Sequence, residues 1–174
     1  MRSFIPIALI CLAKNAVADG CPVAPDHSIA VDKLYSELKR APDQMTSRPY
    51  SNQLWELWLD APDQPSQMML DESLRAMRSG DFARAVDRLN ALVSYCPFYA
   101  EGYNQRAYLS FLNKDYERAL PDLDQAISLN PLHTGALTGK ALTLIALGKD
   151  AEAQIALQKA VSLNPWLSER ALLK

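Results

Sequence analysis

Residues 100–133 read AEGYNQRAYLSFLNKDYERALPDLDQAISLNPLH, and they form the middle of three units that repeat every 34 residues. A proline marks the same place near the end of each unit, at Pro97, Pro131 and Pro165. Other places agree as well: place 8 is small, place 20 is alanine and place 24 is leucine (Ser73, Ala107, Ala141; Ala85, Ala119, Ala153; Leu89, Leu123, Leu157). A helical repeat of this length predicts a solenoid in which each unit packs against its neighbours.

Each unit is expected to fold as a helix, a short turn and a second helix. In the first unit the pattern predicts helices over residues 67–79 and 82–95, with Gly80 at the turn, because glycine readily takes a positive φ. Small residues at places 8 and 20 would let the two helices of a unit approach closely. The predicted fold is therefore all-α, an α–α superhelix of three helix–turn–helix repeats over residues 66–165 (66–99, 100–133 and 134–167).

The regions beside the repeats are expected to cover the two ends of the array. Before it, apolar stripes predict one helix over residues 28–41 and a second over residues 51–60. Trp55 and Trp58 lie in the second stripe. We expect this capping pair to pack on the first unit, because terminal units of a solenoid need a cover. After the array, residues 166–174 are expected to form a short capping helix on the last unit.

The tetrapeptide Ala-Pro-Asp-Gln occurs twice before the repeats, at residues 41–44 and 61–64. Proline disfavours helix at the residue before it. We therefore interpret both copies as helix stops, and residues 45–50 as a loop.

Residues 1–18 have the pattern of a secretory signal peptide. Arg2 precedes an apolar run at residues 4–13, and the small-residue cleavage site ends at Ala18. The run is too short to span a bilayer. The lack of an Asn-x-Ser/Thr acceptor in the sequence favours a bacterial envelope. We expect a secreted, periplasmic protein in which residues 19–65 hold an extended leader and the capping pair.

Two cysteines, Cys21 and Cys96, follow the cleavage site. In an oxidising compartment such a pair favours a disulfide over two free thiols, and closing so long a loop would contribute about 4 kcal/mol. Alternatively, Cys21 carries a lipid, because Gly20-Cys21 is similar to the end of a bacterial lipoprotein signal. Asp19 and Ala18 depart from that signal and argue against an anchor. A lipid-anchored structural or assembly lipoprotein tethered through Cys21 is therefore the alternative function.

The 34-residue pattern resembles the tetratricopeptide repeat (TPR) family, which has a large residue at place 4, small residues at 8 and 20, and proline at 32. The match covers residues 66–165. Two places depart from the family: place 11 lacks its tyrosine and place 7 lacks its leucine (Ala76, Ser110, Leu144; Glu72, Arg106, Lys140). The chain is also similar to a group of small secreted bacterial TPR proteins, through residues 57–58, 100–107 and 131–137.

The resemblance implies a function, because TPR proteins bind peptides or protein surfaces in a concave groove lined by the first helix of each unit. The polar groove positions here are Asp71, Arg78, Glu101, Asn104, Gln105, Tyr108 and Thr138. One TPR subset clamps the C-terminal carboxylate of its partner with lysine, asparagine and arginine. Those places here hold other residues (Leu70, Leu74, Gln105, Gly135, Gly139). The clamp is absent, so we expect a hydrophobic or amphipathic peptide.

Arg106 lies at place 7, which normally faces the interface between the two helices of a unit. A buried guanidinium needs a carboxylate, and Glu72, Asp122 or Asp124 could supply it. We interpret this group as a structural ion pair rather than a ligand site.

Other functions find little support in the sequence. The formal net charge is −2 and basic residues do not cluster, which argues against nucleic acid as a partner. His27 and His133 show no metal-ligand spacing, and His133 is expected to cap or bond the turn in which it lies. Without a catalytic or cofactor motif, we expect no enzyme, metal or cofactor, and predict a protein- or peptide-binding adaptor or assembly factor.

Overall fold

The computed structural model describes residues 20–174, and every regular element in this range is a helix. The predicted signal peptide and its cleavage site lie outside the described residues. The elements are α1 (Ser28–Arg40), α2 (Gln44–Trp58), α3 (Gln64–Arg78), α4 (Phe82–Tyr95), α5 (Ala100–Leu112), α6 (Tyr116–Leu129), α7 (Thr134–Ala146), α8 (Asp150–Leu163) and the short 3-10 helix η1 (Ser168–Leu172).

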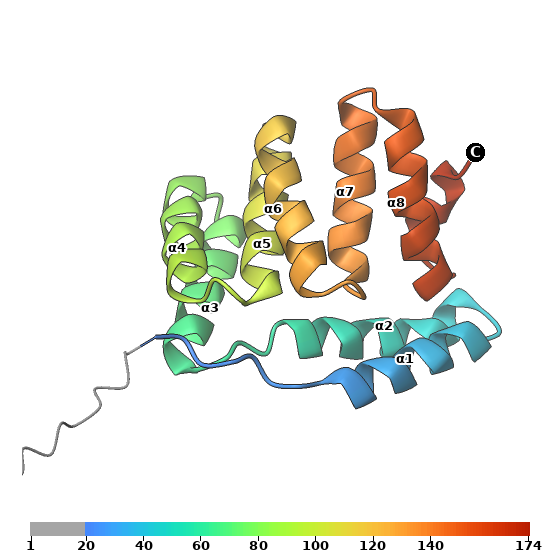
Figure 1. Cartoon of the computed structure of the whole chain (residues 1–174), viewed down its shortest axis with the longest axis horizontal. Coiled ribbons are helices and arrows are strands. Elements are labelled where there is room, and N and C mark those ends of the chain that lie inside the picture. The colour runs from blue at the N-terminus through green and yellow to red at the C-terminus, as the bar shows by residue number, and fades with distance from the viewer. Residues whose placement is uncertain (1–19) are drawn as a thin grey trace, which may run out of the picture.

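The three repeats form antiparallel hairpins, α3–α4, α5–α6 and α7–α8, which stand side by side (Figure 1). The α–α superhelix predicted from the sequence is confirmed. Its alanines at place 20, Ala85, Ala119 and Ala153, are fully buried, so the paired helices approach closely where the sequence offers only a methyl group.

The turn between the two helices of a unit takes the same backbone conformation three times. Gly80, Lys114 and Gly148 occupy equivalent places and have φ of 76°, 61° and 72°. This left-handed conformation suits glycine at the end of a helix. In the second unit the position is occupied by Lys114, whose side chain makes the same conformation sterically costly.

The two Ala-Pro-Asp-Gln copies start helices as well as stop them. Asp43 and Asp63 cap α2 and α3 with the same extended backbone, and their carboxylates accept bonds from the backbone N–H of Thr46 and Ser66. The loop predicted at residues 45–50 is therefore wrong, because α2 begins at the residue after Asp43. Pro49 lies inside α2 and is tolerated there.

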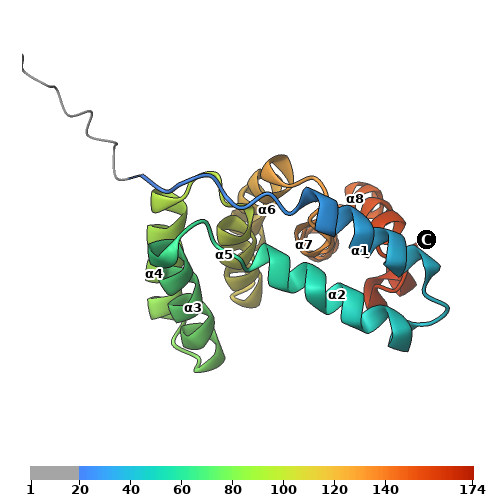
Figure 2. The same cartoon turned by 90° about the horizontal axis from the view of Figure 1, so that it is seen from below.

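The hairpin formed by α1 and α2 does not cover the first repeat as we expected. It runs along one edge of the array, below the ends of the repeat helices (Figures 1 and 2). Its apolar core packs on Leu132, Leu163 and Trp166, which belong to the later units and to the segment after them. The apolar stripes of α1 and α2 are therefore buried against bulky side chains at the ends of the second and third repeats.

Both inter-repeat turns, and the segment after the third repeat, bond to this hairpin. Tyr99 in the first turn donates its hydroxyl to the carbonyl of Trp58 at 2.7 Å. In the second turn the carbonyl of Leu132 accepts a bond from the Tyr35 hydroxyl. After the third repeat, Trp166 donates Nε1 to the carbonyl of Leu38 at 2.9 Å. The contacts therefore recur along the array with the period of the repeat.

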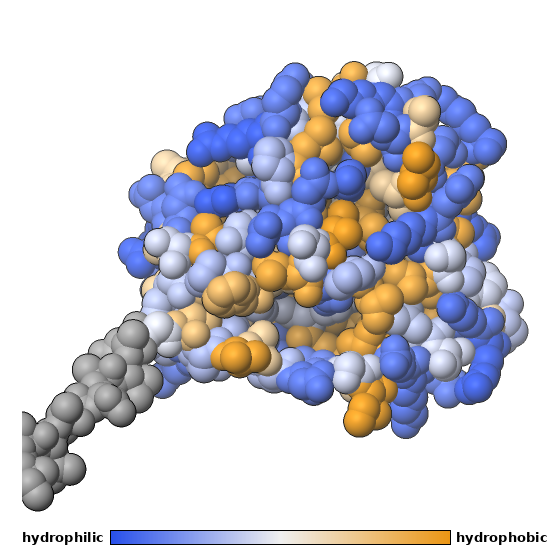
Figure 3. Space-filling model, viewed as in Figure 1, coloured by the Kyte–Doolittle hydropathy of each residue, from blue (hydrophilic) through white to orange (hydrophobic). Residues whose placement is uncertain are grey.

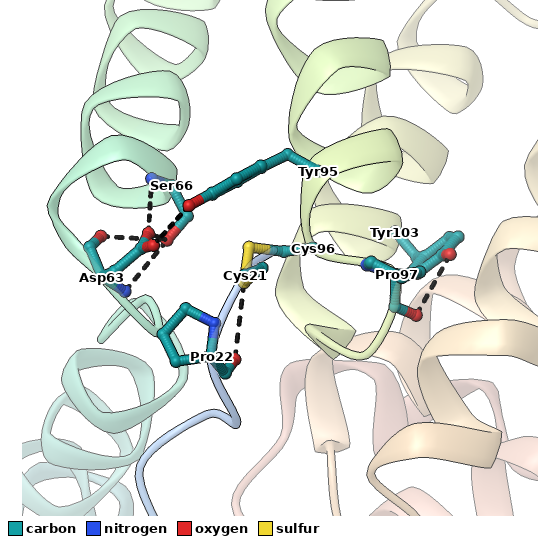
Figure 4. Close-up of a disulfide and its surroundings, with 8 residues drawn as sticks. All are labelled: Cys21, Pro22, Asp63, Ser66, Tyr95, Cys96, Pro97 and Tyr103. Carbon is teal, nitrogen blue, oxygen red and sulfur yellow. Dashed lines mark hydrogen bonds between the residues drawn. A yellow bond between two sulfur atoms is a disulfide. The ribbon is translucent and has the colours of Figure 1, made fainter. Parts of the chain in front are cut away.

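A disulfide joins Cys21 to Cys96, with the two Cα atoms 5.0 Å apart, as the sequence predicted. It ties the N-terminal segment to the end of α4 (Figure 4). Asp63 lies beside it and accepts a bond from the Tyr95 hydroxyl at 2.7 Å. The two sulfur atoms and the Asp63 carboxylate are close enough to share a metal ion, but bonded sulfurs are not thiolate ligands.

The segment after α8 is only partly helical and lies against the last repeat. In place of the predicted helix over residues 166–174, η1 forms and buries none of its residues. Leu173 packs on the apolar cluster of α7 and α8.

The face seen in Figure 3 is largely hydrophilic, with apolar side chains gathered where the array meets the hairpin. No helix among residues 20–174 combines the length and apolar character needed to cross a membrane.

Candidate binding cavity

A cavity of about 840 Å³ lies between the hairpin and the inner helices of the second and third repeats. Its floor comes from α5 and α7, one wall from α2, and one end from residues 164–169 after the last repeat. In Figure 2, α2 lies on the same side of the array as α3 and α5. The hairpin therefore covers one side of the concave groove and leaves a half-open site of the size that ligands usually occupy.

Aromatic side chains line much of this cavity (Trp55, Trp58, Tyr108, Phe111, Trp166). Trp55 and Trp58 meet edge to face, with ring centroids 5.2 Å apart. Trp55 can lie against α7 only because Gly135 lacks a side chain, since a Cβ there would fall 2.8 Å from the Trp55 ring. Trp55 and Tyr108 remain 39% and 51% exposed, so both rings are available to a ligand.

Beneath the floor, one buried carboxylate bonds three polar side chains. Glu101, at the start of α5, is 1% exposed and accepts bonds from Asn104 Nδ2 at 3.0 Å and Gln105 Nε2 at 2.5 Å. His133 Nε2 lies 2.6 Å from the same carboxylate. A carboxylate with several donors is the arrangement in which a buried charge is tolerated.

The tautomer of His133 follows from its second bond. Its Nδ1 accepts the backbone N–H of Ala136 at 3.2 Å and so caps α7. The ring proton is therefore on Nε2, and it is donated to Glu101. His133 is fully buried, and its ring stacks on Trp58 with centroids 4.1 Å apart. One imidazole thus links the second repeat, the third repeat and the hairpin.

The charge of Glu101 also fixes how the two amides face the cavity. A carboxylate only accepts hydrogen bonds, so Asn104 and Gln105 must point their NH₂ groups at it. Their oxygens are then turned away from Glu101, and both residues line the cavity. Neither amide oxygen is bonded within residues 20–174, and neither is among the buried atoms without a partner, so both are reached by solvent.

Two buried polar atoms of cavity residues lack a partner in the described part of the chain. They are the indole Nε1 of Trp58 and the hydroxyl of Thr138. Buried polar groups are nearly always satisfied. These two atoms are exceptions to that rule.

The seven groove residues chosen from the sequence divide into two sets. Asn104, Gln105, Tyr108 and Thr138 line the cavity, whereas Asp71, Arg78 and Glu101 do not. Asp71 accepts a bond from Gln67 on its own helix, Arg78 is exposed at the end of α3, and Glu101 lies beneath the floor.

The main elements that the sequence analysis missed are the wall from α2 and the role of His133. His133 does cap its turn, but it also lies 32 residues from the carboxylate that it contacts. Its position in the repeat is a usable signal: Tyr99 and His133 hold the last place of the first two units, where an exposed turn would have no need of a bulky ring.

Polar residues on the other side of α5 form ion pairs away from the cavity. Arg106 donates two bonds to Asp122, at 2.7 and 2.6 Å, and this raises the pKa of the guanidinium. Glu72 contacts Arg88 at 3.0 Å and not Arg106. Asp124 pairs with Lys140. Of the three carboxylates considered, only Asp122 serves Arg106, because it faces α5 from the helix of the same unit.

The fold is a solenoid of α-hairpin repeats with a cavity on its concave side. Two models of the tetratricopeptide repeat match the sequence, one over residues 70–124 and one over residues 110–166. Together they span residues 70–166, more than half of the chain. The chain belongs to the tetratricopeptide repeat family.

Similar proteins share this repeat over part or most of their length. A TPR repeat-containing protein of Rhizobium etli is 26% identical over 145 residues, covering 83% of this chain and 71% of the relative. Tetratricopeptide repeat protein 36 of Xenopus tropicalis is 31% identical over 114 residues, covering 63% and 56%. The chain thus spans little more than half of the frog protein.

Solved structures with the same fold include peptide complexes. The first TPR of Spaghetti (RPAP3), bound to the HSP90 peptide SRMEEVD, superposes with a TM-score of 0.61 at 22% identity, over 63% of this chain and 86% of that one. The TPR2B domain of yeast Sti1, in its pHsp70 complex, gives 0.59 at 22% identity, over 63% and 90%. At these identities the likeness concerns the fold.

Proposed function

We propose that this protein is a non-enzymatic module that binds a protein or peptide, and that it acts as an adaptor or assembly factor in the bacterial cell envelope. The observation that carries the proposal is the cavity of about 840 Å³ on the inner helices α5 and α7. It combines exposed aromatic rings with free hydrogen-bonding groups, which is the composition of sites that hold a ligand.

The TPR fold supports the same direction. Structures of similar fold hold peptides, namely SRMEEVD in the Spaghetti TPR and SGPTIEEVD in the second TPR of human RPAP3. The envelope location rests on the signal-like residues 1–18 and agrees with the disulfide of Cys21 and Cys96, since such bonds persist in oxidising compartments.

The lipid-anchored alternative has less support. A lipid at Cys21 would need its sulfur, and that sulfur is bonded to Cys96. The two modifications exclude each other on one molecule, so the mass of the mature protein separates them.

Site-specific photocrosslinking tests the proposal. A photoreactive phenylalanine analogue replaces Tyr108 in the cavity, and in a matched variant it replaces Ile155, which is exposed on α8 outside the cavity. Both variants are produced in the native envelope and illuminated. We expect a discrete crosslinked protein band from position 108 and none of the same mass from position 155.

Two results would contradict the proposal. Equal bands from both positions would show contact that ignores the cavity. No band from position 108, with the protein folded and in the envelope, would remove the cavity as a protein-binding site.

A further inference from the structure

We propose that the cavity receives a basic side chain of the bound peptide, with its guanidinium or ammonium group donating to the amide oxygens of Asn104 and Gln105. This inference rests on the proposed function, because it specifies which peptides the same cavity accepts. It predicts the reverse of the acidic peptides SRMEEVD and SGPTIEEVD found in TPR structures of similar fold.

The two amides are held in one direction by Glu101. Glu101 accepts one bond from each NH₂ group, so the oxygen of each amide is turned away from Glu101, on residues that line the cavity. Neither side chain can rotate its amide by 180° without placing an oxygen against a buried carboxylate. The preference for a donor on the ligand is therefore fixed by the protein before a ligand arrives.

A buried carboxylate lies under the cavity floor. His133 uses Nδ1 as an acceptor and Nε2 as a donor, so its ring is neutral and the Glu101 charge is solvated by hydrogen bonds alone. The basic residues nearby on α5 and α7 are engaged elsewhere, Arg106 with Asp122 and Lys140 with Asp124. In a poorly solvated site an uncompensated negative charge favours a cation over several ångströms.

The charged residues that line the cavity do not cancel this preference. There are two within the described chain: Arg48, which is exposed on α2, and Glu169, which is half-buried after α8. Their formal charges sum to zero, and the buried carboxylate leaves the site negative.

Aromatic rings on the cavity surface also favour a cation. Trp55 and Tyr108 line the cavity and keep exposed ring surface, and tryptophan and tyrosine faces attract cations. A guanidinium is planar, stacks on such rings and offers several donors at once, so we expect arginine to bind more tightly than lysine.

A random dodecapeptide library selected on the mature, disulfide-bonded protein tests this choice of ligand. We expect the enriched peptides to share an arginine or lysine. In resynthesised peptides, replacing that residue with glutamine should weaken binding about tenfold or more, the usual effect of losing a charge-assisted hydrogen bond, and replacing it with glutamate should weaken binding further.

Protein variants place the bound residue. Tyr108→Ala removes an exposed ring of the cavity and should weaken the arginine peptide, whereas Phe98→Ala removes a 77% exposed ring outside it and should not. Arg48→Gln and Glu169→Gln are a matched pair of opposite sign. We expect the first to strengthen the arginine peptide about two- to threefold and the second to weaken it by a similar factor.

The outcomes separate the two proposals. Neutral or acidic peptides that still depend on Tyr108 would overturn the basic-residue inference and leave the peptide-binding function standing. Selected peptides that bind equally well to the Tyr108→Ala variant, or a selection that enriches none, would overturn both.

Discussion

At Cys21 the N-terminal segment is joined to the array by a covalent bond, whereas α1 and α2 are held to the array by packing and hydrogen bonds alone. The disulfide holds an extended segment beside the first repeat and lies away from the cavity. The hairpin buries Leu38, Leu54 and Trp58, and α2 forms a wall of the cavity. The first attachment can therefore be removed without changing the binding site, and the second cannot.

Breaking the packed attachment should have the larger effect. Trp58 is 6% exposed, stacks on His133 and lines the cavity. We expect Trp58→Ala to lower the free energy of unfolding by about 3–5 kcal/mol and to weaken ligand binding as well. Urea denaturation followed by circular dichroism measures the first effect.

Phe98→Ala is the matched control, because it deletes an exposed aromatic ring at the same edge of the array. It should change stability by less than about 0.5 kcal/mol. Equal losses from the two variants would mean that the hairpin is not a packed part of the fold.

Removing the covalent attachment should cost less and leave the cavity intact. We expect the double variant Cys21→Ser, Cys96→Ser to lose about 2–4 kcal/mol, since the crosslink acts mainly on the unfolded chain. Binding of an arginine peptide, measured well below the melting temperature, should stay the same. A reductant should lower the stability of the native protein to that of the variant and should not affect the variant.

The repeats were predictable because identical spacing repeats the same packing requirement three times. The position of the hairpin was not, because an apolar stripe such as that of α1 shows that a surface is buried but not which surface covers it. The loop predicted at residues 45–50 failed for a local reason. That stretch lacks an apolar stripe of its own, and the Asp43 cap together with packing of the later part of α2 extends the helix through it.

The polar cluster shows a second limit of sequence reasoning. Glu101 was predicted to line the groove but lies beneath its floor, whereas His133 caps its turn as expected. Their contact joins two units through burial, and neither residue type indicates a partner 32 places away. The small residues of the repeat gave no such difficulty, because their role depends on the adjacent helix alone.

The hydroxyl of Tyr35 offers a pH test of the packed attachment. Burial raises the pKa of Tyr35 to about 12, above the value of about 10 for an unfolded chain. The unfolded state therefore loses this proton first, so the stabilising contribution is fully present below pH 10 and is lost as the pH rises towards 12. We expect a loss of about 2–3 kcal/mol across that interval.

Tyr35→Phe should remove this part of the alkaline decline, since it has no hydroxyl to ionise, while Tyr108→Phe, at an exposed position, should follow the native curve. Denaturation midpoints collected from pH 8 to pH 12 give the comparison. Parallel curves for the native protein and Tyr35→Phe would show that the Tyr35 bond to Leu132 does not hold the hairpin.

The smallest change in stability should come from Gly135, where the hairpin approaches α7 most closely. A Cβ at this position would lie 2.8 Å from Cη2 and 3.1 Å from Cζ2 of Trp55, so Gly135→Ala must displace the ring. The cost of overpacking is about 1–3 kcal/mol, but alanine favours a helix over glycine by about 1 kcal/mol, and the half-exposed ring can move. We expect a net loss of about 1 kcal/mol and a clear shift of the Trp55 indole signal in the NMR spectrum.

Gly139→Ala is the control, because its Cβ would meet the buried Leu123 at 3.0 Å and should leave the Trp55 signal in place. An unshifted Trp55 in the Gly135 variant would mean that the hairpin does not rest on α7, and the packed attachment would then reach only the turns.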